Sequence, residues 1–133
     1  KGYIEKNKDV ENSLHFYVKM CSLSVTAESL AGLGLILAND GIHPDTGKRL
    51  LSSQAVKIVK TLMFTCGMYD GSGEFAVRVG IPSKSGVGGG IMAVVPTRMG
   101  IGIFSPALDE KGNGYAGIML LQKLSEQLFL SIF

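Results

Sequence analysis

The spacing of apolar residues changes at Gly67, and this change limits the possible folds more than any other feature of the sequence. Before Gly67, apolar residues recur at three- and four-residue steps, which is typical of helices packed along one face. After it, short apolar runs are separated by glycine and proline, which favours strands. Strands joined by short connections favour antiparallel pairing. The order of helices, small antiparallel sheet and closing helix predicts an α+β fold.

Three helices are expected in the first half, because each apolar pattern follows a residue that caps helix N-termini. The capping residues are Asp9, Thr26, and either Ser52 or Ser53. Gly41 suits the left-handed backbone position that ends the second helix. The first helix has one apolar face, which consists of Val10, Leu14, Tyr17 and Cys21.

The second half is expected to contain three strands and a closing helix. Phe75, Val77 and Val79 alternate along the first strand, and a glycine-rich link over residues 83–90 precedes the second. The strands are assigned to residues 74–80, 91–95 and 100–104, and the helix to residues 115–133. The chain is thus divided into a mainly helical part, antiparallel strands and a closing helix, at residues 1–66, 67–104 and 115–133.

Composition excludes several classes of protein. With 46% hydrophobic and 18% charged residues, the chain can form a core and does not have the composition of a disordered segment. The formal net charge of +2 comes from scattered residues, with no basic run interleaved with aromatic residues, so no nucleic-acid partner is expected. The longest apolar run, residues 30–38, is too short to cross a bilayer, so no membrane partner is expected.

The two cysteines, Cys21 and Cys66, lie within apolar segments and lack a second Cys or His at ligand spacing. We expect buried free thiols in a reducing compartment, the cytoplasm, and no disulfide, metal site or cofactor. The chain has no signal-peptide pattern and begins with Lys1 rather than Met, which indicates a piece of a longer protein.

The glycine-rich stretch over residues 79–91 is the most distinctive candidate for a binding site. Lys84 and Ser85 place a cation and a hydroxyl beside backbone N–H groups that neighbouring glycines leave accessible, an arrangement that can hold a carboxylate or an oxyanion. A phosphate-binding P-loop is excluded, because a strand-like run rather than a helix follows. A flexible hairpin with an isolated lysine is the alternative that composition alone favours.

Two tyrosines are further candidates. Tyr69 lies in the turn over residues 67–73, where its hydroxyl can hold a nucleophile or relay its proton. The alternative is a half-buried ring with its hydroxyl in water. Tyr17 lies on the apolar face of the first helix, and its position alone predicts a core residue.

One arrangement is absent from the sequence. No serine is followed three residues later by lysine. In a Ser-x-x-Lys pair on a helical turn, the lysine amine lies against the serine hydroxyl and helps to remove its proton. This chain cannot supply that pair.

Several runs together resemble the serine-dependent glutaminases. They occur in the family's order, and the resemblance extends over nearly the whole chain from about Phe16 onward. The runs are residues 16–26, 37–41, 66–75, 80–91 and 105–113.

The resemblance implies a fold like that of the β-lactamases and penicillin-binding proteins, with a helical domain beside an antiparallel sheet. In it, Lys84-Ser85-Gly86 is similar to the Lys-Thr/Ser-Gly strand of that superfamily. The implied reaction is attack by a serine on the side-chain carbonyl of L-glutamine, loss of ammonia, and hydrolysis of the acyl-enzyme to glutamate.

The resemblance also implies roles for three residues. Tyr69 lies at the nucleophile and shuttles its proton, Tyr17 lines the glutamine pocket, and Val87 offers its backbone N–H to the oxyanion. For Tyr17, this replaces the interpretation as a core residue. The supporting strand consists of Lys84, Ser85 and Gly86.

The family's Ser-x-x-Lys pair, and the asparagines and glutamate that hold the substrate, lie upstream of Lys1. We therefore expect residues 1–133 to be the C-terminal portion of a glutaminase domain, inactive alone and completed by the missing N-terminal part of the same protein. Because family members are commonly dimers or tetramers, homo-oligomerisation is expected.

Two other readings stay open at this point. A β-lactamase or penicillin-recognising protein fits the Lys-Ser-Gly strand, although the run over residues 66–75 favours a glutaminase. A non-catalytic assembly module is the reading from a different class of protein.

Overall fold

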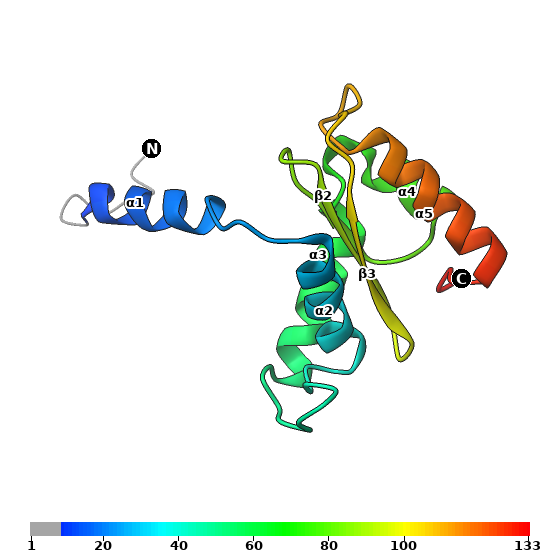
Figure 1. Ribbon diagram of the computed structural model, residues 1–133, viewed down its shortest axis with the longest axis horizontal. Coiled ribbons are helices and arrows are strands. Elements are labelled where there is room, and N and C mark those ends of the chain that lie inside the picture. Colours follow the sequence, from blue (N-terminus) through cyan, green and yellow to red (C-terminus); the bar gives the residue numbers. More distant parts are fainter. Residues whose placement is uncertain (1–8) are drawn as a thin grey trace.

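The computed structural model describes residues 9–133. Within them, a three-stranded antiparallel sheet lies between two helical layers, α2 with α3 and α4 with α5, while α1 projects away from the body (Figure 1). This arrangement confirms the predicted α+β class. The elements are α1 Val10–Cys21, α2 Ala27–Ala38, α3 Ser53–Cys66, the 3₁₀ turn η1 Tyr69–Gly71, α4 Ser72–Arg78, β1 Ser83–Ser85, β2 Gly90–Val95, β3 Met99–Phe104 and α5 Tyr115–Leu128.

The first three helices begin at the predicted caps. The side chain of Asp9 accepts a hydrogen bond from the Asn12 backbone N–H, and that of Thr26 accepts one from Ser29, each at 3.0 Å. Ser52, not Ser53, caps α3. Each cap satisfies a backbone donor that the first turn of a helix leaves unpaired.

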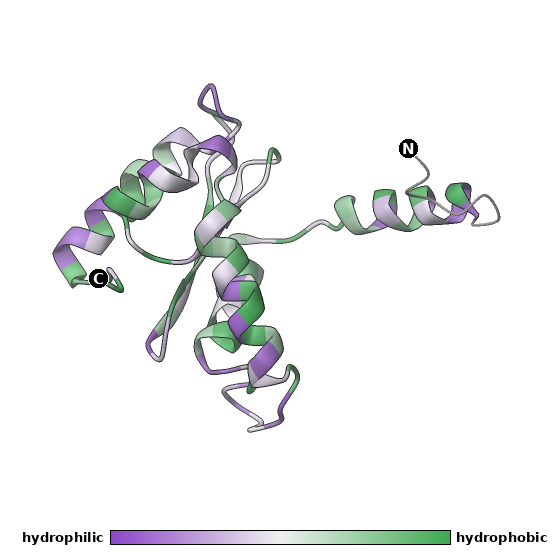
Figure 2. Ribbon diagram, turned by 180° about the vertical axis from the view of Figure 1, so that it is seen from behind, coloured by the Kyte–Doolittle hydropathy of each residue, from purple (hydrophilic) through white to green (hydrophobic). Residues whose placement is uncertain are grey.

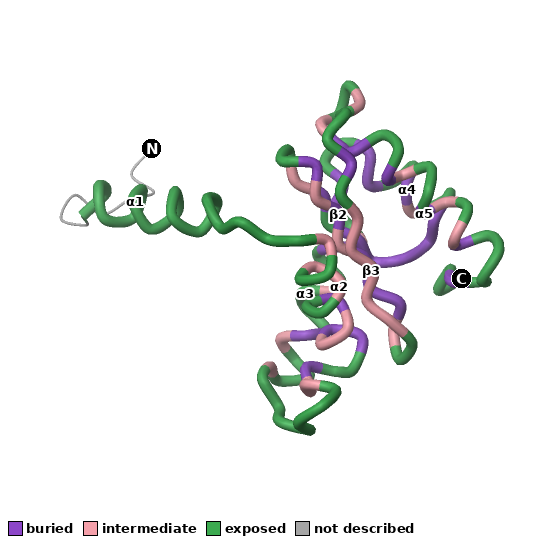
Figure 3. The backbone as a smooth tube through the Cα atoms, in the orientation of Figure 1, coloured by how far each residue is buried: buried purple, intermediate pink, exposed green. Residues whose placement is uncertain are grey.

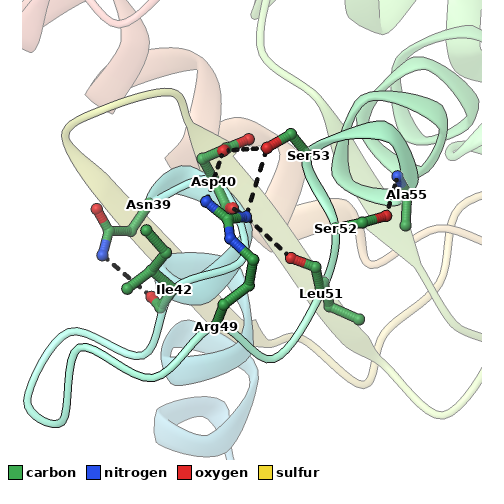
Figure 4. Close-up of polar contacts among 8 residues, drawn as sticks. All are labelled: Asn39, Asp40, Ile42, Arg49, Leu51, Ser52, Ser53 and Ala55. Atoms are coloured by element: carbon green, nitrogen blue, oxygen red, sulfur yellow. Dashed lines mark hydrogen bonds and ion pairs between the residues drawn. The ribbon is translucent and has the colours of Figure 1, made fainter.

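Ser53 instead belongs to a polar cluster between α2 and α3 (Figure 4). Its hydroxyl donates to the Asp40 carboxylate at 2.6 Å, and the Arg49 guanidinium donates to the backbone carbonyls of Asp40 and Leu51 at 2.7 and 3.0 Å. The Asp40 carboxylate also pairs with Arg49 at 3.4 Å. The cluster stabilises a tight reversal of the chain after α2. Asp40 and Gly41 both have positive φ there, and Gly41 was predicted to adopt this conformation.

The side chains of the central strand alternate between two hydrophobic cores, one on each face of the sheet. β2 lies in the middle and pairs antiparallel with β1 and β3. Ile91, Ala93 and Val95 pack with α4 and α5, whereas Met92 and Val94 pack with α2 and α3. This is the period-two alternation of a strand covered on both faces. Figure 2 shows hydrophobic and hydrophilic residues mixed along α3 and α5, as expected for helices with one buried side.

Two glycines of β3 allow α2 to lie directly on the sheet backbone. A Cβ atom added at Gly102 would lie 1.8 Å from the Ala27 carbonyl oxygen, and one added at Gly100 would lie 2.1 Å from the Ala31 carbonyl oxygen. No side chain larger than hydrogen fits at either distance. The close approach of α2 therefore depends on these glycines.

The predicted strand over residues 74–80 is wrong, because this segment forms the helix α4 and the turn after it. Phe75 and Val79 are buried, but Val77 between them is 89% exposed. Residues two apart share a face of a strand, whereas residues four apart share a face of a helix, so alternation at three positions fits both. The Arg78–Glu74 ion pair, 2.9 Å long and four residues apart, is typical of the helix. The antiparallel strands accordingly begin at Ser83 rather than near Gly67.

Other boundaries differ less. β2 and β3 each begin one residue before the predicted strand, and the predicted link contains β1. The closing helix ends at Leu128 rather than Phe133, because Phe129 adopts the left-handed backbone conformation. None of the helices within residues 9–133 is both long and apolar enough to span a bilayer.

The prediction of buried thiols is wrong, because Cys21 and Cys66 are both exposed. Cys21 lies at the end of α1, where none of the residues Val10–Cys21 is buried (Figure 3). The apolar face predicted for this helix is therefore uncovered. Cys66 is the last residue of α3 and is not part of the core in which Val56 and Met63 pack.

Candidate active site

Tyr69 is held in an uncommon backbone conformation at the start of η1, with φ of +50°. The Ser72 hydroxyl donates to the Tyr69 carbonyl oxygen at 2.7 Å and accepts a hydrogen bond from the Met68 N–H at 3.0 Å. A positive φ costs free energy for a residue other than glycine and persists only where neighbouring contacts impose it. Ser72 supplies two such contacts, and these direct the Tyr69 ring away from the core.

Lys84 lies over that ring, with its Nζ atom 4.5 Å from the ring centre. The sheet register explains the orientation, because Lys84 pairs with Met92 on the α2 face of the sheet and Ser85 pairs with Ile91 on the other face. Partial burial lowers the pKa of the Lys84 amine, while an electrostatic interaction with the nearby Cys66 raises it to a smaller extent. An ammonium over a tyrosine face is attracted by the electron-rich ring.

Val87 lies in a tight turn next to the same ring. Gly89 donates from its N–H to the Gly86 carbonyl oxygen at 2.9 Å, which places Val87 and Gly88 at the two central positions of the turn. A Cβ atom added at Gly112 would lie 3.8 Å from Val87 Cγ1 and 3.9 Å from Tyr69 Cε2. Tyr69 and Val87 therefore flank one point and lie on the same side of the molecule.

A hollow of about 680 Å³ adjoins these residues. Its lining includes Lys84, Ser85 and Gly86 from β1 and the glycine turn, and residues 23–27 and Leu30 from the start of α2 and the segment before it. A cation and closely approachable glycine backbone thus border one open space, whereas the buried Ser85 hydroxyl lies on the other face of the sheet and donates to Asn113. Such groups are suited to a carboxylate or to an oxygen that gains negative charge during a reaction.

Tyr17 is the predicted site residue that the described structure does not bring to this wall. It lies on α1 with 64% of its surface exposed. A hydrogen bond and an electrostatic interaction with Cys21 raise the pKa of its phenol, and a smaller electrostatic interaction with Tyr69 acts in the same direction. The other predicted residues, Tyr69, Lys84, Ser85, Gly86 and Val87, lie within this one region.

Sequence reasoning did not assign a role to Asn113, which the structure connects to both halves of the site. Its side chain is 1% exposed and hydrogen bonds with Ser85 and with the carbonyl of Met68. The signal available in the sequence was an amide between two glycines in the run over residues 105–113, but its partners are distant along the chain.

The described residues do not gather a metal site. Among residues 9–133, no three His, Cys, Asp or Glu side chains lie close enough together to hold an ion.

Comparison with known proteins decides the family. The sequence matches the model of the glutaminase family over residues 1–133. The chain belongs to the glutaminase family. It is 59% identical over 132 residues to a glutaminase of Clostridium tetani, covering 99% of this chain and 42% of that protein. It is 58% identical over 132 residues to glutaminase 2 of Clostridium perfringens, covering 99% of this chain and 43% of that protein.

Solved glutaminase structures share the fold. The covalent complex between the Bacillus subtilis glutaminase YbgJ and 5-oxo-L-norleucine matches with a TM-score of 0.92 and 47% identity, over 94% of this chain and 45% of that one. A Bacillus glutaminase in the presence of 4.3 M NaCl matches with a TM-score of 0.91 and 48% identity, over 94% of this chain and 44% of that one. This chain thus spans less than half the length of the glutaminases it matches.

The family match agrees with the resemblance found in the sequence and confirms the predicted glutaminase assignment. It also favours the glutaminase over the penicillin-recognising reading, which the Lys-Ser-Gly strand alone left open. The structural neighbours are glutaminases of the β-lactamase-like fold, as the sequence predicted.

Proposed function

We propose that this chain contributes one wall of the active site of a serine-dependent glutaminase, which hydrolyses L-glutamine to L-glutamate and ammonia. The observation that carries the proposal is the convergence of Tyr69, Lys84 and Val87 at one edge of the hollow. A related glutaminase forms a covalent complex with 5-oxo-L-norleucine on reaction with 6-diazo-5-oxo-L-norleucine, which supports a covalent intermediate here.

The nucleophile is expected from a Ser-x-x-Lys pair in further polypeptide of the same protein. Its oxygen attacks the side-chain carbonyl carbon of glutamine, and the carbon–nitrogen bond then breaks. The Tyr69 hydroxyl takes the serine proton and passes a proton to the leaving nitrogen, so that neutral ammonia departs. Water hydrolyses the resulting ester and returns the serine hydroxyl.

The negative charge that forms on the carbonyl oxygen needs donors already in place. The backbone N–H of Val87 suits this role, because it belongs to a turn closed by the hydrogen bond between Gly89 and Gly86. Lys84 adds positive charge at the same edge. Tyr17 completes the pocket once further polypeptide brings α1 against the hollow.

Three other properties belong to the same proposal. The protein is expected in the cytoplasm, since its two cysteines are free thiols and a reducing compartment preserves them. Its chemistry is expected to need no metal or cofactor, because a serine, a tyrosine and backbone donors account for each step. Copies of the complete protein are expected to associate with one another.

The test compares this chain with the complete gene product that contains it. Ammonia and glutamate are measured after addition of glutamine, and nitrocefin is the control substrate. We expect turnover of glutamine by the complete product, none by residues 1–133 alone, and no nitrocefin hydrolysis by either. Glutamine turnover by purified residues 1–133 alone would show that the nucleophile is wrongly assigned, and nitrocefin hydrolysis without glutamine turnover would overturn the proposed function.

A further inference from the structure

The side chain of Asn113 joins two segments that carry candidate site residues. Its Oδ1 atom accepts a hydrogen bond from the Ser85 hydroxyl, and its Nδ2 atom donates to the Met68 carbonyl oxygen at 3.1 Å. The two partners are 28 and 45 residues away along the chain. Ser85 directly follows Lys84, and Met68 directly precedes Tyr69. One buried amide thus connects the strand under Lys84 with the turn under Tyr69.

Asn113 is itself fixed by its own loop. Its backbone N–H donates to the Asp109 carboxylate at 2.8 Å, and its carbonyl oxygen accepts from the Asp109 N–H at 2.8 Å. The Asp109 carboxylate also accepts from the Lys111 N–H at 2.9 Å. The loop over residues 109–113 is therefore closed by local hydrogen bonds, and the amide projects from a rigid support.

The strained conformation of Tyr69 explains why such an anchor is needed. A positive φ at a tyrosine relaxes unless the peptide groups on both sides are held. Ser72 holds the carbonyl of Tyr69, and Asn113 holds the carbonyl of Met68. The Met68 carbonyl also accepts from the Gly71 N–H at 3.0 Å, but that bond lies within the turn, so Asn113 is the contact that fixes the turn to the strand of Lys84.

We infer that Asn113 is a positioning residue of the proposed glutaminase site, holding the Tyr69 turn and the Lys84 strand at the spacing that the reaction needs. This inference rests on the proposed function. An amide suits the position because it both accepts from Ser85 and donates to Met68. A carboxylate of the same shape could only accept, and it would face the Met68 carbonyl oxygen without a proton to offer.

The chain offers a matched control for a purely structural role. Ser125 on α5 is 5% exposed, and its hydroxyl donates to the Val79 carbonyl oxygen at 2.6 Å. Its partner is 46 residues away along the chain, so this too is a buried hydrogen bond between distant segments. Neither Ser125 nor Val79 belongs to the candidate site. Removing the hydrogen bonds of either side chain lowers the stability of the fold, but only those of Asn113 orient Tyr69.

The first experiment measures kcat, KM and thermal unfolding of the complete gene product with Asn113→Ala or Ser125→Ala. We expect Asn113→Ala to lower kcat by about 100-fold, the size of effect produced by a displacement of about 1 Å, with little change in KM. Ser125→Ala is expected to keep the original kcat. An unchanged kcat in a folded Asn113→Ala protein overturns the inference, as does an equal loss of kcat in the two variants.

A second measurement does not depend on activity. The protons next to the Lys84 ammonium lie over the Tyr69 ring, so their NMR signals are displaced by the ring current. We expect this displacement to disappear in Asn113→Ala and to remain in Ser125→Ala. If the unaltered gene product does not hydrolyse glutamine, the proposed function fails, whereas a displacement that persists in Asn113→Ala overturns the positioning role.

Ser85→Ala is the second variant if Asn113→Ala does not fold. It removes the hydroxyl that donates to Asn113 and leaves the contact with Met68 in place. A fall in kcat, smaller than about 100-fold and again without a change in KM, supports the inference. An unchanged kcat in Ser85→Ala overturns it.

Discussion

At the residue scale, the ring and the hydroxyl of Tyr69 have different roles, and a substitution that removes only the hydroxyl can test them separately. The ring lies beneath Lys84 and beside Val87, whereas the hydroxyl is the group proposed to carry protons. Tyr69→Phe is therefore expected to keep the fold and the contact with Lys84. We expect kcat for glutamine to fall by about 10²- to 10⁴-fold, the contribution typical of a proton-transfer group.

The control for this variant is Tyr115→Phe. Tyr115 is a 61% exposed tyrosine at the start of α5, and we expect its substitution to leave turnover unchanged. Steady-state kinetics with glutamine and thermal unfolding of both variants provide the measurement. Full activity in Tyr69→Phe would remove Tyr69 from the mechanism.

A second residue-scale prediction concerns Asp40 and pH. The hydrogen bond from Ser53 lowers the pKa of the Asp40 carboxyl; burial opposes this, and Arg49 and Lys60 lower the pKa further. Because the folded pKa lies below the unfolded value, the carboxylate stabilises the fold above about pH 4, and this stabilisation is lost as the pH falls through the folded pKa.

Asp40→Asn tests this with little change of shape, since asparagine also tolerates the positive φ at this position. The melting temperature is expected to fall at about pH 7 and to approach that of the unaltered protein towards about pH 2. Ser53→Ala, which removes the main cause of the lowered pKa, is expected to move the loss of stability to higher pH. A difference in melting temperature that is independent of pH would contradict the assignment.

At the element scale, the contact between α2 and β3 depends on the absence of a side chain at Gly102. A methyl group there would overlap the Ala27 carbonyl oxygen, which belongs to a helix backbone and cannot rotate aside. We expect Gly102→Ala to lower the free energy of unfolding by about 1–3 kcal/mol, because it overpacks the layer. Urea unfolding measures the change.

Gly73 in α4 is the matched control, since a Cβ atom added there meets no atom within 4 Å. Gly73→Ala is expected to be neutral or slightly stabilising, because alanine favours the helical backbone more than glycine does. Equal effects of the two substitutions would show that α2 does not lie on β3 as described.

At the scale of the whole molecule, α1 stands apart from the layered body. It has 12 residues and none of them is buried, and an isolated helix of that length is only marginally stable in water. The body, by contrast, contains two buried apolar clusters on opposite faces of its sheet. We therefore expect α1 to open readily while the body stays folded.

Limited digestion with trypsin tests this expectation on residues 1–133. Lys19 in α1 is expected to be cut first, whereas Lys57 and Lys60 are expected to resist, because α3 is anchored by Val56 and Met63. The remaining fragment should unfold at the same temperature as the intact chain. Simultaneous cleavage of α1 and α3 would contradict the expectation that α1 opens while the layered body stays folded.

The same digestion of the complete gene product examines Tyr17. If α1 lies against the hollow there, Lys19 two residues further along is expected to be protected, and glutamine is expected to increase the protection. Rapid cleavage at Lys19 in the complete product would argue against a role for Tyr17 in the pocket.

The sequence by itself determined the features that depend on near neighbours along the chain. The three helix caps, the reversal at Gly41 and the strands β2 and β3 were predictable, because each depends on the backbone preferences of a few consecutive residues. The family was also predictable, because its short runs are preserved in order.

Only the tertiary structure decided which segments meet. Phe75, Val77 and Val79 fit either a strand or a helix, and the packing of Phe75 and Val79 on the sheet selected the helix. The two cysteines lie in apolar segments, yet their burial depends on what covers those segments. Likewise, Asn113 became a link between Tyr69 and Lys84 only through contacts across distant parts of the chain, which no local pattern specifies.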